Sequence, residues 1–281
     1  MQTVQTIDEL KTILEAHKHQ TIGLVPTMGY LHEGHQALLN KARKENEFVV
    51  ATIFVNPAQF GPNEDLDRYP RDIERDVKIA TEAGVDLVFN PTPEEMYPFE
   101  SGITIQVGEL STKLCGESRP GHFDGVLKVI TKLFNLIQPT NAYFGQKDAQ
   151  QLAIIETFAK AYNFPVHIVR VATVREEDGL AKSSRNVFLS EQERVEAIHL
   201  HKALTLATEH WKQTKNIAEA IEIGKAHIEE NTSGKIDYFE VVTYPLLQQV
   251  SEHAEQLLFA TAVFFEKARL IDNILIDVKE V

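Results

Sequence analysis

Two histidines three residues apart stand in the segment PTMGYLHEGH, which runs from Pro26 to His35. A short apolar strand pattern precedes this segment and a helical pattern follows it, so His32 and His35 share one side of the helix's opening turn. Main-chain N–H groups and the positive end of the helix dipole attract anions at such a place. Both histidines can then donate to a phosphate and stabilise charge that develops at phosphorus.

Two other interpretations of this segment stay open. A helix cap beside two surface histidines would give the same HxGH pattern, and the position between a strand and a helix favours the phosphate site over it. A zinc site has less support, because the pattern differs from H-E-x-x-H and no third ligand stands nearby. Gly29 and Gly34 favour the phosphate, because they let it approach the backbone closely.

Neutral amide side chains follow the next strand pattern, in the segment FVNPAQF. Asn56 and Gln59 can both donate and accept hydrogen bonds, and the aromatic Phe60 adjoins them. Such groups suit a small polar substrate whose hydroxyls must be oriented. An ordinary Asn-Pro turn explains these residues equally well when they are taken alone.

Two further segments combine a glycine with charged residues at the start of a helix. In RPGHFDGV, Arg119 suits an anion contact or a lid, although a loop with a capping aspartate fits as well. In FGQKDAQQ, a strand ends in a glycine and a helix begins. Lys147 can meet a phosphate there, Asp148 suits a helix N-cap or a ribose hydroxyl, and Gln151 lies one turn further along.

A later polar segment, DGLAKSSRN, places two cations around two hydroxyls. Lys182 and Arg185 flank Ser183 and Ser184, which is the composition of a mobile phosphate clamp, and a plain interdomain linker is the alternative. The sequence has no P-loop, no GxGxxG after a strand, no GxSxG and no CxxC. The remaining groups favour an in-line displacement at phosphorus, promoted by positioning and charge.

Alternating strand and helix patterns must position these segments. Phe48 to Val55 is a nearly continuous β-branched run, as expected for a parallel strand covered on both faces. The alternation predicts an α/β fold with a Rossmann-like, doubly wound parallel sheet, which binds ligands beyond the carboxyl ends of its strands. We expect helices at residues 8–18, 34–46, 71–83, 124–138 and 148–162, and strands at 21–26, 48–55, 85–89, 142–144 and 166–171.

The pattern changes near residue 175. Two long helical patterns, 190–213 and 217–231, are followed by strand patterns at 238–243, 257–265 and 271–278. We therefore expect two domains, a nucleotide-binding domain over residues 1–174 and a smaller α+β C-terminal domain over residues 175–281.

Composition limits the setting of this chemistry. The 281 residues carry 28 Lys and Arg against 41 Asp and Glu, and the net charge of −13 argues against nucleic-acid binding. With one cysteine, Cys115, no intrachain disulfide can form, and a cytoplasmic location fits best. The first residues lack a signal-peptide pattern. The longest apolar run, Leu257 to Phe265, is about half of the roughly 18–20 residues that cross a bilayer, so we expect no membrane contact.

The segments PTMGYLHEGH, FVNPAQF, RPGHFDGV, FGQKDAQQ and GLAKSSRN together resemble the pantoate–β-alanine ligase family of the HxGH nucleotidyltransferase superfamily. The resemblance implies that the carboxylate of pantoate attacks the α-phosphate of ATP, which gives pantoyl adenylate and pyrophosphate. The amine of β-alanine then gives pantothenate and AMP. The resemblance also implies a homodimer, a C-terminal domain that acts as a lid, and Mg²⁺ carried by the ATP phosphates rather than by a dedicated protein site.

The resemblance assigns roles by position. His32 and His35 would face the α-phosphate, His35 as the family's proton donor, although a carboxylate attack needs charge stabilisation rather than an acid. The expected catalytic set is completed by Lys147, Ser183, Ser184 and Arg185. The residues expected to bind ATP are Pro26, Thr27, Met28, Gly29, Tyr30, Leu31, His32, Glu33, Gly34, His35, Gly145, Gln146, Lys147, Asp148, Val174, Lys182, Ser183, Ser184 and Arg185. Those expected to bind pantoate and β-alanine are Asn56, Gln59, Phe60, Arg119, His122, Val126, Val129, Ile130 and Gln151.

Three positions depart from the family's common pattern: Lys182 replaces a methionine, Gln146 a glutamate and Tyr30 an alanine. Two other functions remain as alternatives. A nucleotidyltransferase with a phosphate acceptor would need more Arg or Lys than the amides Asn56 and Gln59 provide. A nucleotide sensor without catalysis would keep the glycines and lose the histidines or the Lys/Arg clamp.

Overall fold

The computed structural model describes residues 1–62 and 64–280. Within that part, the chain forms two compact units, and each is described by itself. The first comprises Met1–Gly108, Arg119–Gln146 and Ile154–Ala172. The second comprises Glu109–Ser118, Lys147–Ala153 and the chain from Thr173 onward, so it includes two short segments from within residues 1–174.

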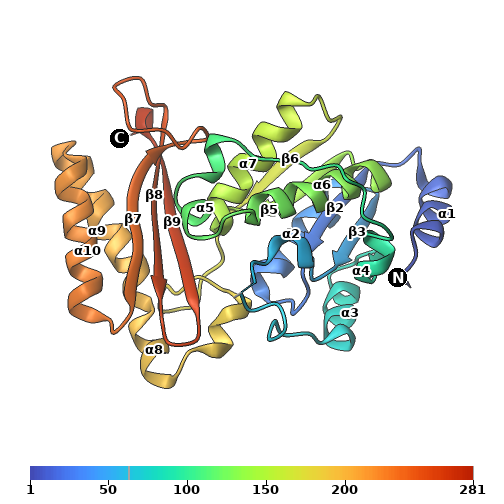
Figure 1. Cartoon of the computed structure of the whole chain (residues 1–281), viewed down its shortest axis with the longest axis horizontal. Coiled ribbons are helices and arrows are strands. Elements are labelled where there is room, and N and C mark those ends of the chain that lie inside the picture. Colours follow the sequence, from blue (N-terminus) through green and yellow to red (C-terminus); the bar gives the residue numbers. More distant parts are fainter. Residues whose placement is uncertain (63, 281) are drawn as a thin grey trace. The chain divides into compact units, whose positions relative to one another are not determined.

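The first unit is built on a parallel sheet (Figure 1). Its six strands within the described residues have the order β1-β4-β3-β2-β5-β6, and all neighbouring pairs are parallel. The order reverses at β2, which has β3 on one side and β5 on the other, and such a switch point is where doubly wound sheets bind ligands. The strands are β1 (Gln2–Val4), β2 (Ile22–Thr27), β3 (Phe48–Ile53), β4 (Leu87–Phe89), β5 (Asn141–Gly145) and β6 (His167–Val171).

Helices cover this sheet as the apolar patterns predict. α2 and α3 pack on one face, where Leu38 and Leu39 of α2 meet Val25, Val49 and Tyr143 of the strands. α1 packs against α6. The helices are α1 (Ile7–His17), α2 (Glu33–Glu45), α3 (Ile73–Glu82), the short α4 (Pro93–Met96), α6 (His122–Ile137) and α7 (Ala149–Ala161), of which the first residues belong to the second unit.

The edge strand β1 has no counterpart among the strands expected from the sequence. It is three residues long and only Val4 is buried, so it is too short to show the two-residue alternation that marks a half-buried strand. It pairs with β4 from Gln2–Leu87 to Val4–Phe89.

The second unit is built on the antiparallel sheet β7-β8-β9 (Figure 1). One face packs against helices α9 and α10, with Trp211 meeting Phe259 and Phe239. The other face buries Leu258 and Ala260 beside Leu114, Ala149 and Tyr244. The elements are α5 (Cys115–Ser118), α8 (Glu191–Glu196), α9 (Ile198–Thr214), α10 (Ile217–Asn231), β7 (Lys235–Thr243), β8 (Gln256–Phe264) and β9 (Arg269–Asp277).

The single helix expected over 190–213 is two helices, α8 and α9. Ser190 caps α8 by accepting the N–H of Glu193, and that helix ends at the fully buried Ala197. The N–H of Leu200 then donates to the carbonyl of Ala197, a tighter turn than the α-helical one. Hydrophobic periodicity continues across such a turn, so the sequence pattern does not reveal it.

Single 3₁₀ turns complete the described chain: η1 (Pro57–Gln59), η2 (Glu109–Ser111), η3 (Gln146–Asp148), η4 (Ser184–Phe188) and η5 (Val278–Glu280). No helix within the described residues combines the length and the apolar character that a bilayer span requires.

Candidate active site

The histidine-bearing turn leaves the carboxyl end of β2, at the switch point of the sheet. Gly29 and Tyr30 both have left-handed backbone conformations, with φ of +84° and +51°. Asp76 of α3 holds this turn, since its carboxylate accepts the N–H groups of Tyr30 at 2.7 Å and Leu31 at 2.6 Å. Burial raises the pKa of Asp76, although the two N–H groups act to lower it.

Asp76 is a residue that the sequence analysis missed. It lies one turn from the fully buried Ala80 on α3, and the residue is 1% exposed. A carboxylate on an apolar helix face is rare unless it is partnered, and this is the signal that the sequence contained.

His32 and His35 form the start of α2 through their Nδ1 atoms. His32 Nδ1 accepts the N–H of Gly34 at 3.1 Å, and His35 Nδ1 accepts the N–H of His32 at 3.2 Å. An Nδ1 that accepts carries no proton, so in this geometry each neutral ring has its proton on Nε2. The ring centroids lie 4.1 Å apart. The two histidines therefore cap a helix and also present two N–H donors of the kind that a phosphate accepts.

Asn56 lies directly before η1 and Gln59 is its last residue. Both follow the carboxyl end of β3. The Asn56 amide donates to Gln59 Oε1 at 3.1 Å and to the carbonyl of Gly125 at 3.0 Å, and its oxygen accepts from Tyr97 at 2.8 Å. Asn56 is thus engaged on both amide atoms, and it holds Gln59 in place. Gln59 Nε2 lies 3.2 Å from the sulfur of Met28, a weak acceptor that a substrate oxygen can replace.

The approach of α6 to η1 depends on a glycine. A Cβ at Gly125 would lie 2.0 Å from the carbonyl oxygen of Ala58, which no side chain permits. From this helix, Val126, Val129 and Ile130 are all buried. Phe60 packs edge-on against Tyr69, with ring centroids 6.1 Å apart.

Arg119 and His122 form a chain of hydrogen bonds that leads to Gln59. Glu64 binds the Arg119 guanidinium through both carboxylate oxygens, at 2.8 and 2.5 Å. Burial acts to raise the pKa of Glu64, but the hydrogen bonds and positive charge of Arg119 outweigh it and lower that pKa. His122 Nδ1 lies 2.7 Å from the Gln59 carbonyl, and its Nε2 lies 3.0 Å from Arg119. Because the carbonyl only accepts and the guanidinium only donates, His122 is neutral with its proton on Nδ1.

In the second unit, Lys147 and Asp148 end the turn η3 and lead into α7. Lys147 and Gln151 are half-buried, and Asp148 is exposed. The neighbouring Gln150 is buried, and its amide donates to the carbonyls of Leu110 and Lys113. Gly145 and Gln146, which precede this turn, belong to the first unit.

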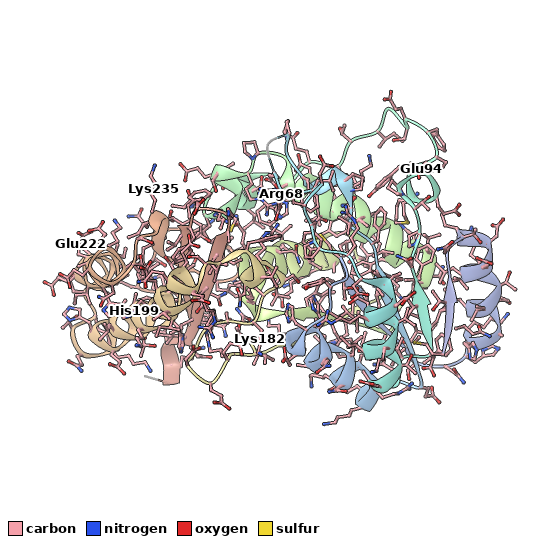
Figure 2. All side chains as sticks on the ribbon, turned by 90° about the horizontal axis from the view of Figure 1, so that it is seen from below. Arg68, Glu94, Lys182, His199, Glu222 and Lys235 are labelled. Atoms are coloured by element: carbon pink, nitrogen blue, oxygen red, sulfur yellow. The ribbon has the colours of Figure 1, made fainter. Side chains whose placement is uncertain are left out.

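The segment from Val174 to Asn186 folds back on itself within the second unit. Arg175 and Ala181 form an antiparallel bridge, and the N–H of Lys182 donates to the carbonyl of Val174 at 3.0 Å. Ser183 caps η4, and Ser184 is buried. The Lys182 ammonium, labelled in Figure 2, lies 2.7 Å from the Glu176 carboxylate. The cation that departs from the family pattern is therefore paired within its own loop.

The expected site residues thus form two groups. In the first unit, contacts through Gln59 connect the histidine turn at Met28 with Asn56 and His122. In the second unit, two residues of β9 bind the other segments. Asn273 donates to the Lys147 carbonyl, and Asp272 accepts from Arg175, which precedes Lys182. Among the described residues, no group of three or more His, Cys, Asp or Glu side chains is arranged to hold a metal ion.

A parallel sheet with a phosphate-suited histidine turn at its switch point is typical of α/β nucleotide-binding enzymes. A sequence model of the pantoate-beta-alanine ligase family matches residues 2–275. The chain belongs to this family.

Individual relatives agree over the whole length. A pantothenate synthetase from Lysinibacillus sphaericus (strain C3-41) is 57% identical over 282 residues, which cover 100% of this chain and 99% of that protein. One from Bacillus cereus (strain ZK / E33L) is 55% identical, over 99% of this chain and 100% of that protein.

Two solved structures are also similar. Pantothenate synthetase from Thermus thermophilus has a TM-score of 0.93 and 48% identity, over 98% of this chain and 99% of that one. Pantoate-beta-alanine ligase from Francisella tularensis, complexed with beta-gamma ATP and beta-alanine, has a TM-score of 0.81 and 33% identity, over 100% of this chain and 98% of that one. The fold expected from the sequence, a Rossmann-like sheet with a smaller α+β part, is confirmed.

Proposed function

We propose that this chain joins pantoate to β-alanine at the expense of ATP, and releases AMP and pyrophosphate. The observation that carries this conclusion is that similarity to pantothenate synthetases extends over the whole chain, at 57% identity to the Lysinibacillus protein. The Francisella relative, complexed with beta-gamma ATP and beta-alanine, supports ATP and β-alanine as substrates here.

The first step is a displacement at the α-phosphorus. A carboxylate oxygen of pantoate forms a bond to phosphorus, the bond to the β-phosphate oxygen breaks, and pyrophosphate leaves. No proton moves in this step, because the carboxylate is already ionised at neutral pH. We assign His32 and His35 to the equatorial phosphate oxygens, where their Nε2–H groups stabilise the developing charge. The remaining residues from Pro26 to Gly34 would line the same nucleotide site.

Cations and hydroxyls of the later motif segments would bind the leaving pyrophosphate. We assign Lys147 and Arg185 to the β- and γ-phosphates, with Ser183 and Ser184 as hydroxyl donors. Asp148 would accept from the ribose and Val174 would pack on adenine. Lys182, which Glu176 already neutralises, would add little net charge.

The second step is amide formation at the acyl carbon of pantoyl adenylate. The neutral amine of β-alanine attacks, the carbon–oxygen bond to AMP breaks, and the amine gives up a proton. Gln59 and Gln151 would hold the hydroxyls of pantoate, and Arg119, which Glu64 already neutralises, would lie on the rim of the pocket. The pocket wall would be formed by Asn56, Phe60, His122, Val126, Val129 and Ile130.

Mg²⁺ would enter on the phosphates of ATP, where it would neutralise charge on the leaving pyrophosphate. We also propose a homodimer in the cytoplasm, with residues 1–174 as the nucleotide- and pantoate-binding domain and residues 175–281 as a lid.

Isotope exchange tests the two-step reaction. The protein is incubated with ATP, Mg²⁺ and labelled pyrophosphate, with and without pantoate, and in the absence of β-alanine. Label that enters ATP only with pantoate supports a reversible pantoyl adenylate. If folded protein that binds ATP gives no exchange with pantoate, the two-step ligation is wrong, and phosphate-bearing acceptors are to be tried next.

A further inference from the structure

Two consecutive residues of β9, Asp272 and Asn273, carry polar side chains into the interior of the second unit. They are 4% and 5% exposed. The side of β9 that packs against α9 and α10 is otherwise formed by Leu270, Ile274 and Ile276. Because side chains alternate along a strand, the two point to opposite faces of the β7-β8-β9 sheet. A buried carboxylate and a buried amide both require partners, so what they bind is informative.

Asp272 binds the start of the loop that carries the expected phosphate clamp. Arg175 donates to its two oxygens from both terminal nitrogens, at 2.7 and 2.9 Å. The same guanidinium donates to the carbonyl of Gly179 at 3.1 Å, across the hairpin that Arg175 and Ala181 close. One planar group thus fixes both sides of the hairpin to the sheet.

Asn273 binds the other expected phosphate segment. Its Nδ2 donates to the main-chain carbonyl of Lys147 at 2.8 Å, in the turn η3 that precedes α7. The sheet therefore holds the hairpin before Lys182 through Asp272, and it holds the backbone of Lys147 through Asn273.

We infer that Asp272 and Asn273 are positioning residues that set the spacing between the two phosphate-binding segments. The inference rests on the proposed function, which assigns Lys147 and Arg185 to one triphosphate. A triphosphate has a fixed length, so two cations stabilise its displacement only while their separation matches it, and a shift of about 1 Å can cost about a hundredfold in rate. Neither β9 side chain is assigned to the substrate, so both would act through the segments that they hold.

The test compares Asp272→Asn and Asn273→Ala with the wild-type enzyme in steady-state kinetics and pantoate-dependent pyrophosphate exchange. We expect each variant to lower kcat/KM for ATP by about ten- to a hundredfold, while the KM for pantoate changes by less than about twofold. Asp272 and Arg175 act as one unit in this view, so Arg175→Met and the double variant with Asp272→Asn should show the same loss as either single variant.

Asp237→Asn is the matched control. Asp237 on β7 binds Arg269 of β9 at 2.6 and 3.0 Å, in the same sheet, but it holds neither Lys147 nor the hairpin. It should leave the KM for ATP unchanged. Thermal unfolding of all variants shows how much stability each has lost. Asn273→Ala removes a neutral side chain that donates to the Lys147 carbonyl, so it stays informative if Asp272→Asn does not fold.

Lys147→Ala and Arg185→Ala separate the two ways of failing. If they lower kcat/KM for ATP and the two β9 variants do not, or if the β9 variants only lower the melting temperature as the control does, the inference is overturned. If Lys147→Ala and Arg185→Ala leave ATP kinetics unchanged, the assignment of the clamp is wrong and the inference falls with it.

Discussion

The main-chain N–H of His32 donates to Nδ1 of His35, 3.2 Å away, so the second histidine of the motif caps the helix that the first one begins. This contact fixes the proton of His35 on Nε2. The cap, which uses Nδ1, and the proposed phosphate contact, which would use Nε2, therefore involve different atoms of the same ring.

Substitutions at His35 can distinguish the function of Nδ1 from that of Nε2. Glutamine places an amide N–H near the position of Nε2, whereas asparagine places an acceptor near that of Nδ1. We expect His35→Asn and His35→Ala to lower the rate of pyrophosphate exchange by about 10²–10³-fold, as for the loss of one charge-stabilising donor. His35→Gln should retain several-fold more activity. An asparagine variant that is more active than the glutamine variant would show that capping, and not donation, is the function of His35.

Asp76 should support the histidine turn. Asp76→Asn keeps one acceptor and leaves the second main-chain N–H without one, so it should reduce the free energy of unfolding by about 1–3 kcal/mol and raise the KM for ATP. Urea unfolding and initial rates measure the two effects. Glu74→Gln, an exposed position on the same helix, is the control and should change neither. An unchanged KM in Asp76→Asn would mean that the turn holds its shape without this carboxylate.

The pair His199 and His227 should make stability depend on pH. Their Nδ1 and Nε2 atoms lie 2.9 Å apart between α9 and α10, and His199 is labelled in Figure 2. Burial and the nearby Lys202 lower the pKa of both rings, and the charge of His227 further lowers the pKa of His199.

The sign follows from proton linkage. Below the unfolded histidine pKa of about 6.5, the unfolded chain binds more protons than the folded one, so stability falls as the pH drops from about 7 toward 5. His227→Gln should flatten this decline in urea unfolding, and the exposed His253→Gln should leave it as in the wild type. A decline that is equally steep in His227→Gln would rule out this pair as its source.

Glu176 should weaken nucleotide binding by competing with phosphate for Lys182. Glu176→Gln removes the negative charge 2.7 Å from the ammonium. We expect the KM for ATP to fall by about two- to fivefold at low salt, the range of a partly exposed ion pair, and the gain to shrink as salt is added. In a Lys182→Met background, Glu176→Gln should lower the KM for ATP by a smaller factor. A KM that rises in Glu176→Gln would indicate that the pair orders the loop instead.

The elements of the fold could be predicted because their signals are local. The helical pattern at 217–231 coincides with α10, and the β-branched run from Phe48 contains β3. Three motif segments could be located for the same reason, since PTMGYLHEGH, FVNPAQF and FGQKDAQQ begin at or directly after the ends of β2, β3 and β5. Glu64, Asp76 and Asp272 could not be assigned, because each binds a segment at least 45 residues away in the sequence. What sequence does show is a carboxylate at a position whose neighbours on the same face are apolar, as in the run Leu270, Asp272, Ile274.

The absence of a Cβ atom at Gly125 has a consequence for substrate choice. Because the backbone of α6 meets the carbonyl of Ala58 directly, the place of Asn56 and Gln59 relative to this helix is determined by main chain against main chain. No side-chain substitution there can bring the amides closer, and any substitution moves them away. In the proposed pocket, a change in the length of the accepted acid would therefore come from Val126, Val129 and Ile130, where methyl groups can be added or removed one at a time.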